Sequence, residues 1–122
     1  MWPRKKDGPA PYSFLPEPVD FLGQQAGPVE DELKTAFLPV IAATPTVQSA
    51  YLARIYRSKA TKPSVALCIR STIGEDVKVE DRLAEIFKSR FRGDQSLDFL
   101  FLLEEEENRL RSVCPPFYER HA

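Results

Sequence analysis

Two runs of the sequence, VQSAYLARIY at Val47–Tyr56 and SVALCI at Ser64–Ile69, decide how the fold is interpreted. Both are rich in β-branched, aromatic and aliphatic residues, and the polar, basic segment 57–63 separates them. This pattern is typical of two adjacent antiparallel strands joined by a solvent-exposed loop. Neither face of the first run is uniformly polar, which predicts an inner strand covered on both sides. Alternate residues of that run are expected to share one face: Val47, Ser49, Tyr51, Ala53 and Ile55.

A helix is predicted to precede this hairpin and to begin at Pro28. Proline suits the first helical turn, and the acids of segment 30–32 complement the positive end of the helix dipole. Pro39 lies inside the pattern, so the helix is expected either to kink there or to end near Leu38. Apolar residues at steps of three and four form one face of this helix: Val29, Leu33, Ala36, Phe37, Val40 and Ile41.

A second helix and a third strand are predicted after the hairpin. Asp76 or a neighbour is expected to cap the helix, and Gly93 occupies a usual stop position. The nearly continuous apolar run Ser96–Leu103 then predicts a buried strand. A strand–helix–strand step of this length indicates a parallel, right-handed crossover. The helix is expected to bury one face: Val79, Leu83, Ile86, Phe87 and Phe91.

A final helix is predicted to open at Glu104–Glu107 and to bury Leu110, Val113 and Cys114. Four consecutive helical acids point in different directions, so they are interpreted as a solvated, dipole-capping group and not as a cation site. The predicted fold class is α+β, a single small domain of order α-β-β-α-β-α. Its mixed three-stranded sheet combines the antiparallel hairpin with the parallel crossover and is covered by helices.

The N-terminal segment differs from the rest of the chain in composition. Six of the eleven prolines lie within residues 1–28, which disfavours regular structure. The segment also carries several apolar side chains, for which a solvated linker has little use. We interpret residues 1–27 as a Pro-rich extended arm that packs on the domain of residues 28–120 or on a neighbouring subunit. The alternative is a disordered leader.

Charge and hydropathy exclude several classes of partner. Seventeen basic and eighteen acidic residues give a formal charge of -1, so there is no overall electrostatic basis for binding nucleic acid or an anionic membrane. A basic, aromatic cluster at Phe87–Arg92 is expected to bury its phenylalanines, which disfavours nucleic-acid stacking. No apolar run approaches the ~20 residues of a membrane span. None of signal-peptide length follows the basic start, and we expect a cytoplasmic protein.

The sequence offers no recognisable catalytic set, metal site or cofactor site. The single histidine, His121, lies beside the C-terminus, and Cys68 and Cys114 have no metal-ligand spacing. Cys68 lies within a predicted strand and lacks a nearby base, so it is interpreted as a core thiol. Segment 23–27 lacks the Lys-Ser/Thr pair of a phosphate loop. We therefore expect no enzyme activity and no cofactor.

One group of residues is retained as a candidate ligand-binding site. If the closing segment Phe117–Arg120 folds back over the first strand, a tyrosine, a carboxylate and two arginines converge on a groove. Arginine suits carboxylate or phosphate ligands because its guanidinium binds them in bidentate geometry. The alternative is that the aromatic pair forms a hydrophobic latch and that Glu119 and Arg120 form a surface pair. The candidate ligand-binding residues are Tyr51, Arg54, Tyr118 and Arg120.

Two stretches together give the chain a family resemblance. They are TVQSAYLARI at 46–55 and PFYER at 116–120, with Leu97-Asp98-Phe99 as a third match. The pattern resembles the C-terminal domain of the enhanced serine sensitivity protein SseB, over about residues 30–120. The resemblance implies the fold, but no established catalytic residue or cofactor. Larger members carry a separate N-terminal domain, where this chain has its Pro-rich arm, so an activity of that domain is not transferred.

The expected function is that of a non-catalytic binding or protein-interaction module of this family. We expect a protein partner or self-association, and no nucleic acid or membrane. The alternative is a regulatory domain that binds an amino acid or small acid, or a weak enzyme, at the groove of Tyr51, Arg54 and Tyr118. The sequence does not identify a small-molecule ligand.

Overall fold

The computed structural model describes residues 19–57, 62–91 and 95–120. The predicted arm up to residue 18, part of the hairpin loop, the predicted stop at Gly93 and the histidine His121 lie outside the described residues. The elements follow in the order β1 (Val19–Gln24), α1 (Pro28–Ala42), β2 (Val47–Arg57), β3 (Ser64–Ser71), α2 (Val77–Arg90), β4 (Asp98–Phe101), α3 (Glu104–Arg111) and β5 (Tyr118–Glu119).

The predicted α+β class and the order of its six elements are confirmed, from α1 to α3. Strand β2 pairs antiparallel with β3, and β3 pairs parallel with β4. The sheet has five strands where three were expected, in the order β1-β2-β3-β4 with β5 also on β2. The additional strands β1 and β5 pair with different parts of the same edge of β2. Residues 19–24, which the sequence assigns to the arm, are therefore part of the sheet.

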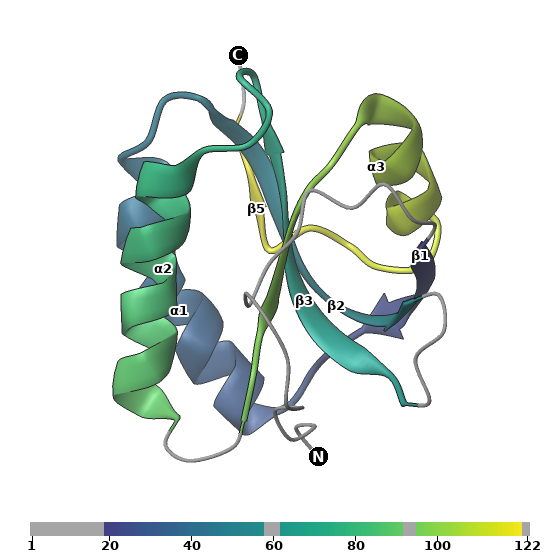
Figure 1. Ribbon diagram of the computed structural model, residues 1–122, viewed down its shortest axis with the longest axis horizontal. Coiled ribbons are helices and arrows are strands. Elements are labelled where there is room, and N and C mark those ends of the chain that lie inside the picture. The colour runs from purple at the N-terminus through teal and green to yellow at the C-terminus, as the bar shows by residue number, and fades with distance from the viewer. Residues whose placement is uncertain (1–18, 58–61, 92–94, 121–122) are drawn as a thin grey trace.

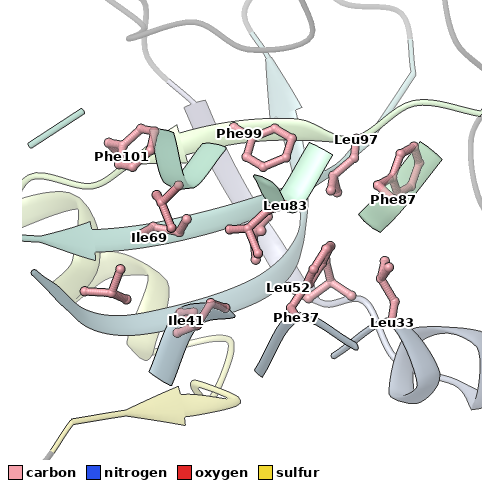
Figure 2. Packing of buried hydrophobic residues seen from close by; sticks show 14 of the residues in the cluster. Leu33, Phe37, Ile41, Leu52, Ile69, Leu83, Phe87, Leu97, Phe99 and Phe101 are labelled. Atoms are coloured by element: carbon pink, nitrogen blue, oxygen red, sulfur yellow. The ribbon is translucent and has the colours of Figure 1, made fainter. Parts of the chain in front are cut away.

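Helices cover both faces of this sheet, with α1 and α2 on one side and α3 on the other (Figure 1). Two apolar cores result. The larger core lies between the sheet and the pair α1 and α2, and Figure 2 shows side chains of the two helices meeting those of three strands. The smaller core lies on the α3 side, where Leu110 and Cys114 meet Tyr51, Ala53 and Cys68. Strand β2 is buried on both faces, as predicted.

Helix α1 begins at Pro28 as predicted, but it continues past Pro39 to Ala42. Pro39 is exposed, so the carbonyl group that loses its amide donor can reach solvent. Val29 is also exposed, because it lies at the helix start and outside the buried stripe. The residues of α1 that are fully buried are Leu33, Phe37 and Ile41.

Helix α2 is capped as predicted, since the Asp76 side chain accepts a hydrogen bond of 3.3 Å from the amide of Val79. Its buried stripe is Val79, Leu83 and Phe87.

The predicted burial of Val113 is wrong. Helix α3 ends at Arg111, and the turn that follows directs this valine outward.

A β-bulge in β2 changes the predicted alternation of side chains. The register with β3 shifts between Val47 and Ser49, which places an extra residue in β2. Val47 consequently packs in the core beneath α1 and α2, whereas Ser49 and Tyr51 face α3. The prediction that Val47 shares a face with Ser49 is therefore wrong. The bulge leaves Ser49 and Tyr51 two residues apart on the face that α3 covers.

Candidate functional site

A group of interacting polar side chains surrounds Glu107 on the α3 face of the sheet. Strand β2 provides Ser49 and Tyr51 from alternate positions, and α3 provides Glu107 and Arg111 from successive turns. Arg70 of β3 and Glu119 of β5 complete the group. We call these six residues the Glu107 network.

Three donors bind one oxygen of Glu107. The Tyr51 hydroxyl donates to Oε2 at 2.6 Å, the Ser49 hydroxyl donates to the same atom, and Arg111 Nη2 donates to it at 3.3 Å. The other oxygen, Oε1, lies 4.0 Å from Arg70 Nη1. The Glu107 side chain is only 13% exposed, so these bonds replace most of the water that the carboxylate would otherwise bind.

Arg111 connects this carboxylate to the last strand. Its Nη2 donates at 2.7 Å to Glu119, and its guanidinium lies 5.8 Å from the ring centroid of Tyr51. The network thereby joins β2, β3, α3 and β5. The contacts of Arg111 are half-exposed, so each contributes less than the bonds made by the buried Tyr51.

The environment fixes the protonation states of the network. Burial raises the pKa of Tyr51, and its hydrogen bond to the Glu107 carboxylate raises it further. For Glu107, burial raises the pKa, but hydrogen bonds from Ser49, Tyr51 and Arg111 outweigh it and leave a net lowering. Tyr51 is therefore held as a hydrogen-bond donor and Glu107 as an acceptor. This arrangement ties α3 to the sheet, and it offers no base or nucleophile poised near neutral pH.

The prediction that Glu104–Glu107 form a solvated, capping group holds for its first three members. Glu104 and Glu105 are exposed, and Glu106 Oε1 accepts from the Leu103 amide at 2.8 Å. For Glu107 the prediction is wrong, because its carboxylate is bound on the sheet. A signal was present in the sequence: Glu107 shares a helical stripe with the buried Leu110 and Cys114.

The four predicted ligand-binding residues do not lie in one groove. Tyr51 is buried on the α3 face, whereas Tyr118 packs against the core beneath α1 and α2 on the opposite face. Arg54 is exposed at the far end of β2. Only Tyr118 and Arg120 meet, with the guanidinium 5.8 Å from the ring centroid. The closing segment pairs with the edge of β2, opposite Ser49 and Ala50, and does not fold over its face.

Arg120 has a structural role that the sequence did not reveal. Its guanidinium donates to three backbone carbonyls, at 2.9 Å to Val47, 3.3 Å to Ala42 and 3.0 Å to Thr44. These carbonyls belong to the end of α1, the connection that follows and the first residue of β2. The C-terminal segment thus fixes the turn by which the chain enters the sheet, and most donors of this arginine are occupied.

The two cysteine side chains are buried. Cys68 and Cys114 are free thiols, and burial raises the pKa of both, that of Cys114 to about 11. A thiol with a raised pKa is a poor nucleophile at neutral pH.

Phe87 stacks on Phe91 with ring centroids 4.6 Å apart. Within residues 19–57, 62–91 and 95–120, no group of three or more His, Cys, Asp or Glu side chains is arranged to hold a metal ion.

The two stretches that carry the family pattern lie side by side, because β5 in the closing PFYER pairs with β2. Comparison with known families matches residues 16–120 to the SseB protein C-terminal domain. The chain belongs to this family. No curated protein and no solved structure matches it significantly. None of the described helices is long and apolar enough to span a bilayer.

The fold explains why this SseB C-terminal domain carries its pattern residues. Asp98, in the Leu-Asp-Phe match, forms an ion pair of 3.5 Å with Arg57 and so connects β4 to the end of β2. Glu119 and Arg120 hold β5 through Arg111 and the backbone carbonyls. In this chain, the side chains of Asp98, Glu119 and Arg120 are used for packing and strand pairing, and they identify the fold without identifying a reaction.

Proposed function

We propose that this SseB C-terminal domain is a non-catalytic protein-interaction module that associates with a second copy of itself. The observation that supports the proposal is a pair of exposed apolar side chains, one on β1 and one in the turn just after α3. Leu22 exposes 48% of its surface and Val113 exposes 45%. The Val113 carbonyl lies 3.9 Å from where a Cβ on Gly23 would lie, so the two segments are adjacent. We use the name β1–α3 surface for Leu22 and Val113 together with Phe21 and Arg109, whose guanidinium lies 5.6 Å from the Phe21 ring centroid.

The position of β1 supports a partner that is an extended chain. Among the described residues, β1 pairs only with β2 and forms one edge of the sheet. An edge strand offers unpaired backbone groups, and a second copy of the same strand can bind them about a twofold axis. The register shift between Phe21 and Gly23 interrupts the regular ladder. A bulge of this kind disrupts the ladder locally, so it limits edge-to-edge growth and confines pairing to the regular part of β1.

The use of the polar side chains supports a non-catalytic function. Tyr51 and Glu107 bind each other beneath α3, and Arg120 binds backbone carbonyls. Cys68 and Cys114 are buried thiols whose pKa is raised. The alternative of a small-ligand site was based on a convergence of Tyr51 with Tyr118, and these lie on opposite faces of the sheet. We therefore retain the interaction module as the single proposal.

The test is to place a charge on the proposed surface. Leu22→Lys and Val113→Lys replace half-exposed side chains, so each is expected to fold with a stability change within about 1 kcal/mol. Ile73→Lys is the matched control, because Ile73 is 61% exposed on the turn between β3 and α2. Multi-angle light scattering should show that the first two variants lose the dimer that the wild type and Ile73→Lys retain. Equal dimerisation of all four proteins would count against this surface.

A further inference from the structure

Glu80, in the first turn of α2, is a buried acid with one carboxylate oxygen that has no hydrogen-bond partner among the described residues. It is only 3% exposed, and its Oε1 atom is buried and accepts no hydrogen bond in the part of the chain that the structure describes. Native proteins pair nearly all such groups, because an unpaired polar atom loses its water without replacement. The other acids near this helix start are more accessible: Glu75 is half-buried and Asp81 is exposed.

Among the residues that the structure describes, no positive charge compensates that of Glu80. The charged groups that act on it are Glu75 and Asp81, and both are acidic. The end of α1 lies at the same end of the fold as the start of α2 (Figure 1), and residues 36–42 include no titratable side chain. The sheet presents apolar residues to α2, such as Ile69 and Phe101. Arg120 also lies at this end, but its guanidinium binds backbone carbonyls.

We infer that Glu80 is a pH-sensitive element, whose protonated form lets the first turn of α2 pack on the sheet and whose ionised form loosens that turn. The turn carries Val79, which belongs to the larger core, and the exposed Val77, and it follows the exposed Ile73. Loosening it would therefore uncover additional apolar surface at this end of the fold. The inference goes beyond the proposed self-association and does not depend on it.

The direction of the pH dependence follows from the sign of the shift. Burial raises the pKa of Glu80 to about 7, and repulsion by Glu75 and Asp81 contributes to the increase. An unfolded glutamate has a pKa of about 4.3, so the unfolded chain loses this proton first as the pH rises. The contribution of Glu80 to the stability of α2 is therefore greatest below the unfolded pKa, and it is lost as the pH rises through the folded pKa of about 7.

The test combines a direct titration with a matched pair of variants. The Glu80 carboxyl carbon is followed by NMR in the wild-type chain, and its midpoint is expected near pH 7. Amide protection in segment 79–84, corrected for intrinsic exchange, is expected to fall by about tenfold between pH 6 and pH 8. Glu80→Gln should abolish this fall, because the amide stays neutral. Glu85→Gln, on an exposed position of the same helix, should retain it.

Two results would overturn the inference. A Glu80 midpoint near the ordinary carboxyl value would show that the ionised form is accommodated. An unchanged pH dependence of protection in Glu80→Gln would show that another group is responsible. The titration uses the unmodified chain, so it decides the question even if Glu80→Gln folds poorly.

Discussion

The Tyr51 hydroxyl donates a hydrogen bond of 2.6 Å to Glu107 and so connects the central strand to the helix that covers it. The two residues are 56 positions apart in the sequence. Because Ser49 and Arg111 bind the same carboxylate oxygen, the contact belongs to a network that spans four elements. The polar side chains of this network are thus used to assemble the fold.

Glu107→Ala should destabilise the chain by about 2–3 kcal/mol, because it leaves the buried hydroxyls of Ser49 and Tyr51 without an acceptor. Urea unfolding measures the change. Glu105→Ala is the control, since Glu105 is exposed on the same helix and its loss should cost less than about 0.5 kcal/mol. Similar effects of the two substitutions would show that Glu107 contributes only as a helical acid.

Acid should weaken the same contact. The pKa of Glu107 is lowered in the folded chain, so its contribution to stability is present above the unfolded value of about 4.3 and is lost as the pH falls through the folded value. Glu107→Gln keeps an acceptor for the hydroxyls but cannot be protonated. Between pH 5 and pH 3, the unfolding free energy of Glu107→Gln should therefore fall less than that of the wild type. The difference between the two falls should be about 1 kcal/mol for each unit by which the folded pKa of Glu107 is lowered. Parallel pH profiles would contradict this.

Gly27→Ala should be more costly than an alanine at another glycine with positive φ. Gly27 has φ +149, and a Cβ there would lie 2.6 Å from Glu30 Oε1. The Glu30 carboxylate cannot move freely because Gln25 Nε2 donates to it at 2.7 Å. We expect a loss of about 2–3 kcal/mol. Gly74→Ala, with φ +75 and no atom within 4 Å of the added Cβ, should cost about 1 kcal/mol. Equal losses would show that Glu30 yields easily.

Arg120→Ala should loosen the entry to β2 by removing donors from the carbonyls of Ala42, Thr44 and Val47. The expected loss is about 1–3 kcal/mol, with faster amide exchange in segment 44–48. Arg120→Lys should recover only part of it, because an ammonium lacks the planar fork of a guanidinium. Arg54→Ala, at an exposed site, should be nearly neutral. Full recovery by lysine would assign the effect to charge alone.

The sequence predicted the elements with strong periodicity and missed those formed by pairing. Apolar patterns and caps predict helices α1 and α2 and the hairpin, because these signals lie within the elements themselves. Strand β1 lies in a Pro-rich composition and is stabilised by backbone bonds to residues 53–57, more than 28 positions away. Strand β5 has two residues, too few for a pattern. Both depend on tertiary contacts that a local signal does not contain.

The candidate site was mispredicted for the same reason. Tyr51 and Tyr118 were expected to converge, but edge pairing places Tyr118 opposite Ala50, so its ring points to the other face. The register also directs Glu119 toward Arg111 on the α3 face. A shift of one residue in β5 would exchange the two side chains between faces. Register of this kind is set by the assembled sheet and is not visible in the sequence.

Sedimentation velocity of the unmodified chain, measured across a concentration range of about a hundredfold up to high micromolar, tests the central claim most directly. Self-association predicts that the weight-average mass rises with concentration from about that of one 13.9 kDa chain toward that of two. A mass that stays at one chain throughout would contradict the claim that the β1–α3 surface binds a second copy.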